Sequence, residues 1–371
     1  MSEKILQLNN LETSFFTHLG EVKAVRGVTY GLNKGGVLGI VGESGSGKSV
    51  TSLSIIRLIE SPGKIKNGEV IFDGVDLTTL SESEMQELRG SEISMIFQDP
   101  MTSLNPVYTI ENQMVEVIRR HMKIPKEQAL EEAKLITNES KKAKELEDIE
   151  KGITRPFNKQ EAFDRAINYL TLVGIPEPEE RIGQYPHQFS GGMRQRALIA
   201  MALSCEPKLL IADEPTTALD VTIQAQILDL LKDIQKNLGT SIIFITHDLG
   251  VIAEICQDVV VMYGGMVMEK GTVEEIFYNA QHPYTKGLHQ SIPKDIVGQK
   301  ERLVPIDGSP PDLLSPPKGC PFSPRCEHAM EVCLQEAAPL YKISDTQVSA
   351  CWLQDPNAPV VKGFTKSGGA E

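Results

Sequence analysis

GESGSGKS, residues 42–49, decides the fold of this 371-residue chain. The stretch fits the phosphate-loop pattern G-x-x-x-x-G-K-[ST], with an apolar strand-like run before it (Val37–Val41) and a helix-like stretch after it (Ser49–Glu60). Its glycines let backbone N–H groups approach phosphates, and the following helix turns its positive end toward them. A glycine-rich turn between a strand and a helix would explain the glycines. It would not explain a Lys-Ser pair at the one place where phosphate charge and a metal ion need ligands.

Each residue type in this loop has its own expected role. Lys48 would reach the β- and γ-phosphates of a nucleotide, and the Ser49 hydroxyl would ligate Mg²⁺. The nucleotide-binding residues predicted from the loop are Gly42, Ser44, Gly45, Ser46, Gly47, Lys48 and Ser49.

Two further strand-like runs end in polar side chains. Leu209–Ala212 leads into Asp213 and Glu214, and Ser241–Ile245 leads to His247. The carboxyl ends of parallel strands meet at one sheet edge, where α/β proteins bind their ligands. We expect Asp213 to join the Mg²⁺ shell, Glu214 to polarise the attacking water and His247 to contact the γ-phosphate. A histidine after a strand is otherwise an ordinary loop residue.

A second anion site is predicted at Ser190, Gly191 and Gly192. Serine is a favoured helix N-cap, and the glycine pair exposes backbone amides where the helix-like stretch Gln195–Leu203 opens. The segment could be only a capped helix. However, one chain needs no second phosphate site for a single nucleotide, so the pattern indicates ATP shared between two subunits.

These segments together resemble the nucleotide-binding subunit of an ATP-binding cassette (ABC) transporter. The matching motifs are the Walker A loop at 42–49, the Q-loop with Gln98 in MIFQDP, the signature motif at 189–193, Walker B at 209–214, the D-loop at 218–220 and the switch histidine His247. The signature is FSGGM where LSGGQ is commoner, but its Ser190, Gly191 and Gly192 are kept.

The resemblance also implies roles for single residues. An aromatic residue near the N-terminus, Phe15 or its neighbour Phe16, is expected to stack on adenine. Glu214, His247 and Gln98 are expected to act in hydrolysis. The resemblance further implies that Mg²⁺ is held by Ser49, Gln98 and Asp213.

Several other segments are typical of one subfamily, the ATPases of oligopeptide and dipeptide importers. They are MTSLNP (101–106), YPHQFSGGMRQR (185–196), HPYTKGL (282–288), GSPPDL (308–313) and GCPFSPRC (319–326). This resemblance implies an ATP-hydrolysing subunit that powers peptide import at the cytoplasmic face of the cell membrane. Its implied partners are a second ATPase subunit (a sister chain in a heterodimer), two membrane permeases and an extracellular substrate-binding protein.

Two alternatives to peptide import remain open. One is an importer of nickel or another small solute, because related importers share this C-terminal pattern. The other is a soluble cassette ATPase outside transport, although that class generally carries two cassettes in one chain or a long coiled-coil insertion.

The predicted fold is α/β. It is a phosphate-loop ATPase core with a mostly parallel sheet, an N-terminal antiparallel β layer, an inserted helical subdomain and an accessory C-terminal region. We expect the first part of the core at 1–98, the helical subdomain at 99–185, the second part of the core at 186–285 and the Pro/Cys-rich C-terminal region at 286–371. Within a charged stretch near 124–160, the segment KKAKELEDIEKG (141–152) favours a solvated helix that ends near Gly152. The stretch is interpreted as an exposed extension of the subdomain or as a docking insert.

Charge and hydropathy exclude other classes. The chain has 37 basic and 50 acidic residues, and its net charge of −13 argues against nucleic-acid binding. No apolar run approaches the ~20 residues that span a bilayer, and no signal-peptide pattern opens the chain. We therefore expect a soluble, cytoplasmic protein that reaches a membrane through its partners.

The six cysteines fall into two groups. Cys205 and Cys256 lie in apolar contexts and are expected to be buried. The other four cysteines lie close together in the C-terminal region. A cytoplasmic chain does not normally keep disulfides, so this second group indicates a bound metal. Its spacing, C-x5-C-x6-C-x17-C, lacks the short C-x2-C pairs usual for zinc. We predict a 4Fe–4S cluster, which some ATPases with a similar C-terminal region carry, with zinc or no metal as alternatives. The predicted ligands are Cys320, Cys326, Cys333 and Cys351.

Overall fold

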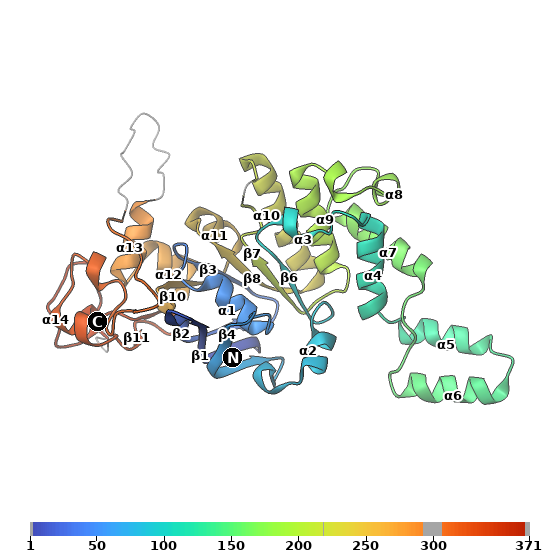
Figure 1. The fold of residues 1–371 in the computed structure, drawn as a ribbon, viewed down its shortest axis with the longest axis horizontal. Coiled ribbons are helices and arrows are strands. Elements are labelled where there is room, and N and C mark those ends of the chain that lie inside the picture. The colour runs from blue at the N-terminus through green and yellow to red at the C-terminus, as the bar shows by residue number, and fades with distance from the viewer. Residues whose placement is uncertain (1–2, 218, 292–305, 368–371) are drawn as a thin grey trace. The chain divides into compact units, whose positions relative to one another are not determined.

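The computed structural model describes residues 3–217, 219–291 and 306–367 (Figure 1). These residues form two compact units. Unit 1 holds residues 3–85, 211–215, 231–291 and 306–367, and unit 2 holds residues 86–210, 216–217 and 219–230. Ala218 of the predicted D-loop lies outside the described residues.

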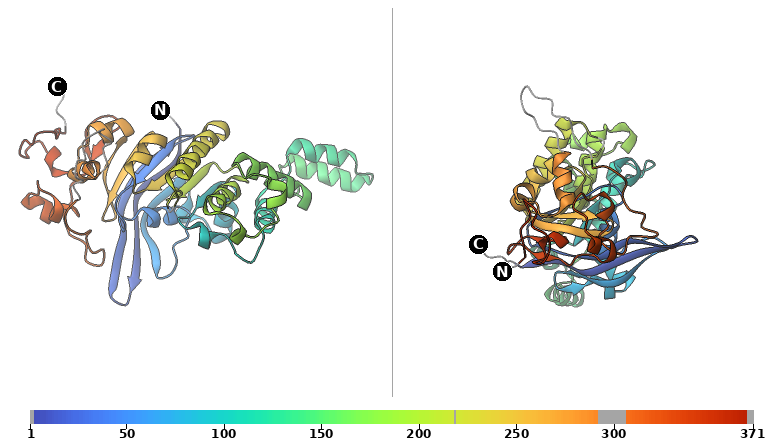
Figure 2. Two further views of the ribbon diagram at one scale, coloured as in Figure 1. Left: turned by 90° about the horizontal axis from the view of Figure 1, so that it is seen from above. Right: turned by 90° about the vertical axis from the view of Figure 1, so that its left-hand side faces the viewer.

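An antiparallel β layer opens unit 1 and confirms the predicted one. The hairpin of β1 (Lys4–Thr17) and β2 (Gly20–Asn33) is the long dark-blue ribbon pair in the left view of Figure 2. β4 (Gly63–Phe72) pairs with the other side of β1, and β5 (Val75–Asp76) follows, so the strand order is β2-β1-β4-β5. β1 continues through Asn9-Asn10, where its register with β2 shifts between Leu8 and Leu11.

The main sheet of unit 1 carries the phosphate loop. Its strand order is β11-β12-β10-β9-β3-β8-β7. β3 pairs in parallel with β8 and β9, and β10 runs antiparallel to β9. Every residue of β3, β7 and β8 is buried, as expected of parallel strands covered on both faces. The bounds are β3 Val37–Val41, β7 Leu209–Asp213, β8 Ser241–Thr246, β9 Asp258–Tyr263, β10 Met266–Thr272, β11 Tyr341–Lys342 and β12 Val348–Ser349.

Helices flank these strands or connect them. Those that lie in unit 1 or begin or end there are α1 Lys48–Ile55, α2 Glu82–Leu88, α10 Val221–Leu238, α11 Leu249–Ile255, α12 Val273–Tyr278, α13 Pro283–Gln290 and α14 Glu331–Gln335. Within the described ranges, no helix is both long enough and apolar enough to cross a bilayer.

Unit 2 is mostly helical. In it α4 packs on α7, and α7 packs on α9. Polar N-caps fix several helix starts; the Thr109 hydroxyl, for example, accepts a hydrogen bond from the Asn112 N–H. The bounds are β6 Ile93–Ile96, α3 Pro100–Ser103, α4 Ile110–His121, α5 Lys126–Lys134, α6 Glu139–Glu150, α7 Lys159–Leu172, α8 Pro178–Arg181 and α9 Gly191–Leu203.

The charged stretch forms a helical hairpin, and its second helix, α6, covers most of the segment 141–152 for which a helix was predicted. α5 and α6 lie side by side in Figure 1 and pack on each other. Ala129, Ala133 and Ile149 are buried between them with Ile124, which gives the hairpin a small apolar core of its own. The chain turns before α6, where the Asn138 side chain accepts the Lys141 N–H as an N-cap. The first helix, α5, was not predicted, because charged residues dominate it.

The C-terminal region is joined to the main sheet through a buried carboxylate. Glu269 on β10 is fully buried and accepts hydrogen bonds from the N–H groups of Gln281 (2.6 Å) and His282 (3.0 Å) and from Nε2 of Gln347 (2.9 Å). Burial raises the pKa of Glu269 to about 7. β12 also pairs with β10, so part of this region extends the sheet.

Candidate functional site

The loop at 42–47 joins β3 to α1 in a shape that requires glycine. Gly47 caps α1 with φ +96°, and a Cβ at this position would lie 2.5 Å from the carbonyl oxygen of Ala24. The backbone of β2 therefore packs closely against the start of α1.

Lys48 is folded onto this loop. Its Nζ donates to the carbonyl oxygens of Gly42 (2.8 Å) and Glu43 (3.0 Å), and the residue is only 5% exposed. Burial lowers the pKa of Lys48, while the carboxylates of Glu214, Asp213 and Glu43 oppose the shift. Phosphate oxygens are stronger acceptors for an ammonium group than these neutral carbonyls, so the lysine is placed to exchange them for an anion.

Two side chains with oxygen atoms, those of Ser49 and Asp213, lie near Lys48. The Ser49 hydroxyl donates to Oδ1 of Asp213 across 3.2 Å, and Asp213 is nearly fully buried at the end of β7. Burial raises the pKa of Asp213, which marks a carboxylate that lacks a full countercharge. A hydroxyl and a carboxylate are the oxygen donors that Mg²⁺ prefers, so this pair fits the ion.

Glu214 and His247 follow the ends of neighbouring strands. The Glu214 N–H donates to the carbonyl oxygen of Ile245 (2.9 Å), and its φ of +49° is a costly backbone conformation for a residue other than glycine. Oε2 of Glu214 lies 3.5 Å from Nδ1 of His247, whose side chain is 63% exposed. A half-buried carboxylate thus stands beside an exposed imidazole at the sheet edge that holds Asp213.

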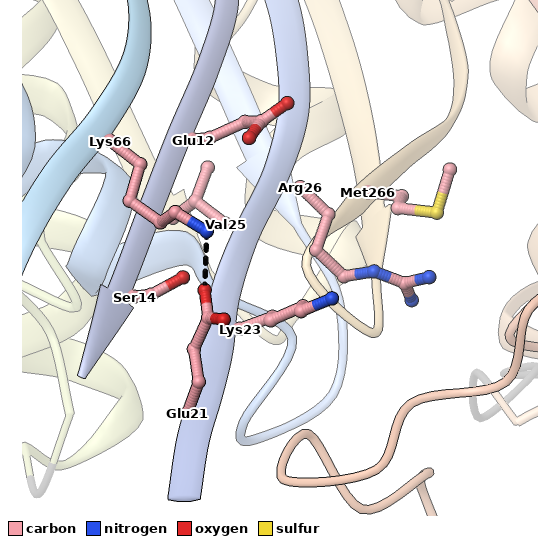
Figure 3. A pocket seen from close by; sticks show the side chains of 8 residues that line it. All are labelled: Glu12, Ser14, Glu21, Lys23, Val25, Arg26, Lys66 and Met266. Carbon is pink, nitrogen blue, oxygen red and sulfur yellow. Dashed lines mark hydrogen bonds and ion pairs between the residues drawn. The ribbon is translucent and has the colours of Figure 1, made fainter. Parts of the chain in front are cut away.

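A polar pocket lies between β1, β2, β4 and β10 (Figure 3). It measures about 240 Å³, and an ion pair of 2.7 Å joins Lys66 to Glu21 inside it. Backbone hydrogen bonds connect it to the phosphate loop, since the Arg26 N–H donates to Gly265 and the Gly265 N–H donates to Ser46. The lining residues are Glu12, Ser14, Glu21, Lys23, Val25, Arg26, Lys66 and Met266. The sequence analysis missed these cations, because they come from different strands and follow no common spacing.

The two candidate aromatic residues lie on different sides of β1. Ser14 lines the pocket, whereas Phe15 packs toward Gly63, where a Cβ would lie 2.7 Å from its ring. Phe16 is 44% exposed and lies under Nζ of Lys66, 6.0 Å from the ring centroid. The adenine contact of Phe15 or Phe16 stays a prediction.

The remaining predicted residues belong to unit 2. The Ser190 hydroxyl accepts the Met193 N–H at the start of α9, and nothing lies within 4 Å of a Cβ added to Gly191. Gly192 is half-buried and packs toward Ile223. Gln98 is exposed just after β6. The start of α9 therefore presents accessible backbone amides, as an anion site requires.

The predicted iron–sulfur cluster is wrong. Among residues 3–217, 219–291 and 306–367, no three His, Cys, Asp or Glu side chains are grouped so that they could hold a metal ion, which also excludes the zinc alternative there. The four C-terminal cysteines line one apolar cavity of about 20 Å³, room for about one water molecule. Burial raises the pKa of the Cys320 thiol to about 11 and that of the Cys351 thiol to about 12. The four predicted ligands that line this cavity are Cys320, Cys326, Cys333 and Cys351.

Two family models match the chain. The ABC transporter family matches residues 25–217, and the family described as oligopeptide/dipeptide transporter, C-terminal region, matches residues 268–333. The first covers the phosphate loop and the carboxylates of Asp213 and Glu214 at the end of β7, and the second covers α13 and the turn with Cys320 and Cys326.

Curated relatives resemble nearly the whole chain. The oligopeptide transport ATP-binding protein OppD of Bacillus subtilis is 52% identical over 97% of this chain and 91% of its own length. The dipeptide transport ATP-binding protein DppD of the same organism is 51% identical over 96% of each chain. An OppD protein of Haemophilus influenzae is 48% identical over 94% of this chain and 97% of its own length.

Solved structures share the fold. A dimeric ATP-binding cassette in a post-hydrolysis state with ADP and Pi superimposes with a TM-score of 0.58 at 24% identity, covering 72% of this chain and 98% of the other. CbiO1 of Clostridium perfringens gives a TM-score of 0.53 at 26% identity over 74% and 91% of the two chains. These matches confirm the predicted α/β ATPase core.

Proposed function

Because the chain belongs to the ABC transporter family and to its oligopeptide/dipeptide branch, we propose that it is the ATP-hydrolysing subunit of a peptide importer. One observation carries the enzymatic part of this proposal. The phosphate loop and one sheet edge bring together five side chains from three separate parts of the sequence: Lys48, Ser49, Asp213, Glu214 and His247.

The proposed reaction is hydrolysis of ATP to ADP and phosphate. Loop 42–49 would hold the phosphates, with Lys48 as the point charge on the β- and γ-phosphates. Bound Mg²⁺, held by Ser49, Asp213 and Gln98, would supply charge neutralisation. Glu214 would accept a proton from the attacking water and His247 would contact the γ-phosphate, since phosphoryl transfer depends on position and charge.

The proposed assembly requires a second ATPase subunit. Ser190, Gly191 and Gly192 of one subunit would close on the nucleotide held by Lys48 of the other, and a sister chain is the expected partner. Two membrane permeases and an extracellular substrate-binding protein would complete the importer. The chain would then lie at the cytoplasmic face of the membrane, attached through the permeases. We further propose the domain limits expected above, with a C-terminal accessory region from residue 286.

Peptide uptake by cells tests this function. A strain that lacks this chain should lose ATP-dependent uptake of a labelled tripeptide, and the wild-type chain should restore it. Lys48→Ala should fail to restore it, because the phosphates lose their buried countercharge. Lys34→Ala, which removes an exposed ion pair with Glu3, is the matched control and should restore uptake. Normal peptide uptake without the chain, together with lost nickel uptake, would contradict peptide import and favour a nickel importer.

A further inference from the structure

We propose that Arg325, in the C-terminal region, is a positioning residue for the phosphate loop, and that through it this region sets the affinity for ATP. The inference rests on the proposed function and adds a residue that the nucleotide itself does not contact. Arg325 lies 282 positions after its partner in the loop, Glu43.

All three nitrogen atoms of the Arg325 guanidinium donate hydrogen bonds. Nη1 donates to Oε2 of Glu43 (2.7 Å) and to the hydroxyl of Tyr263 (2.9 Å). Nε donates to the carbonyl oxygen of Asp307 (2.8 Å), and Nη2 donates to that of Ile306 (2.9 Å). The Arg325 side chain is only 6% exposed, so these bonds hold it in one orientation.

Glu43 connects Arg325 to Lys48 of the phosphate loop. Its N–H donates to the Tyr284 hydroxyl (2.9 Å), and its carboxylate is held by Arg325. Its carbonyl oxygen accepts the bond from Nζ of Lys48 (3.0 Å). Both sides of Glu43 are therefore fixed by residues from the C-terminal half of the chain, while the same peptide sets the position of Lys48.

The support behind Arg325 is an aromatic cluster. The Phe322 ring packs edge-on against Tyr263, with centroids 5.5 Å apart, and its centroid lies 5.3 Å from that of Tyr284. Pro321 lies against Gly264, where a Cβ would come within 2.8 Å of it. Because rings and proline have few rotamers, this support holds the arginine at little entropic cost.

The C-terminal region also contacts β2 at two points. The carbonyl oxygen of Leu313 accepts the Lys23 N–H (2.9 Å), and that of Pro317 accepts Nη2 of Arg26 (3.0 Å). Lys23 and Arg26 also line the pocket beside the loop. Residues 306–325 thus contact β2 through Leu313 and Pro317, and they contact the phosphate loop itself through Arg325.

Loss of Arg325 should affect binding rather than chemistry. A partly buried Glu43 carboxylate without its partner is costly, so the loop is expected to move until that carboxylate is hydrated. That movement displaces the Lys48 acceptor and the amides that hold phosphate. Glu214 and His247 make no described contact with Arg325, so the turnover number should remain.

The test is a double-mutant cycle in the full-length chain, purified together with its partner ATPase subunit. Arg325→Ala should raise the ATP Kd and KM about tenfold, the factor that corresponds to one charge-assisted hydrogen bond, with kcat within about twofold. Glu43→Gln should raise both constants in the same direction, and the double variant should be no worse than Arg325→Ala. Lys342→Ala removes an exposed ion pair with Asp345 from the same region and serves as the matched control with unchanged constants.

Three results would overturn the proposal: an unchanged ATP Kd in Arg325→Ala, fully additive effects of the two substitutions, or an equal effect in Lys342→Ala. If Arg325→Ala does not fold, Arg325→Lys and Glu43→Gln decide. A KM raised at least about threefold in both supports the proposal, and a wild-type KM in both overturns it. A wild-type chain that binds no ATP would instead contradict the proposed function itself.

Discussion

Glu214 combines a strained backbone with a side chain that faces a histidine. Its φ of +49° is maintained by the hydrogen bond from its N–H to Ile245, and its carboxylate stays 15% exposed, within reach of water. A carboxylate in this position can act as the proposed general base for water, and its charge also raises the pKa of Lys48 against the effect of burial.

Glu214→Gln should therefore lower the ATP hydrolysis rate by about 10²-fold or more while the ATP Kd stays near that of the wild type. The amide keeps the shape of the side chain but cannot accept the proton. Steady-state hydrolysis and equilibrium ATP binding measure the two effects. Glu254→Gln, which alters an exposed acid paired with Lys232, should hydrolyse ATP normally. Normal hydrolysis in Glu214→Gln would remove Glu214 from this role.

Glu269 predicts a pH dependence of stability. Its pKa is about 7 in the folded chain and near 4.5 when exposed, so the folded state keeps a proton that the unfolded state releases between these values. Stability should fall as pH rises through this window, by on the order of 3 kcal/mol in total, because burial penalises the carboxylate.

Thermal unfolding between about pH 5 and pH 8 measures this effect. Glu269→Gln should give a flatter slope than the wild type, although it loses one acceptor and so carries a cost that does not depend on pH. Glu331→Gln, at an exposed position of α14, should keep the wild-type slope. Parallel curves for wild type and Glu269→Gln would refute the assignment.

Single residues were predictable where their signal is local. The phosphate loop has all its ligands within eight positions, so its pattern could be recognised directly. The contact between Glu43 and Arg325 spans the chain and leaves no periodic trace. The cluster prediction from the four C-terminal cysteines failed for another reason: sequence spacing reveals neither the size of the cavity that they line nor the arrangement of their side chains.

Among the elements, the hairpin of α5 and α6 depends on one arginine. Nε of Arg155 donates to Oε2 of Glu132 on α5 (2.8 Å), and Nη2 donates to Oε1 of Glu161 on α7 (2.7 Å). The hydrogen bond from Arg155 lowers the pKa of Glu161 to about 2. Arg155 thus links the hairpin to the helices that follow it.

Arg155→Ala should loosen the hairpin without unfolding unit 2. We expect amide hydrogen exchange in residues 126–150 to speed up by about tenfold, because the small core alone must then hold the two helices. Exchange in α4 and α7 should stay close to wild type. Lys151→Ala, which breaks an exposed i,i+4 pair with Glu147, is the matched control. Unchanged exchange in Arg155→Ala would show that the apolar contacts suffice.

Element types were more predictable than their limits. The buried strands β3, β7 and β8 are continuous apolar runs, which the sequence displays directly. The bounds of β1 were not predicted: asparagine is typical of turns, but pairing with β2 and β4 continues the strand beyond Asn9 and Asn10. Of the hairpin, only the segment that forms α6 was predicted as a helix, since the few apolar residues show their packing only after the chain has turned.

At the scale of the whole molecule, the shared nucleotide site predicts how defects combine in a dimer. Lys48→Ala in this chain and arginine in place of the signature serine of the sister chain should damage the same composite site and leave the second site intact. Placing both substitutions in one subunit should damage both sites. ATP bound per tagged mixed dimer measures the difference. Equal binding in the two arrangements would contradict a site built from both subunits.

The most direct measurement of the central claim is the ATP hydrolysis rate of the purified importer, assembled with its permeases, its partner ATPase and its substrate-binding protein in lipid vesicles. Addition of peptide should raise that rate several-fold and drive peptide into the vesicles, and Glu214→Gln in this chain should suppress both. A rate that responds to nickel but not to peptide, or peptide uptake that persists without Glu214, would contradict the account.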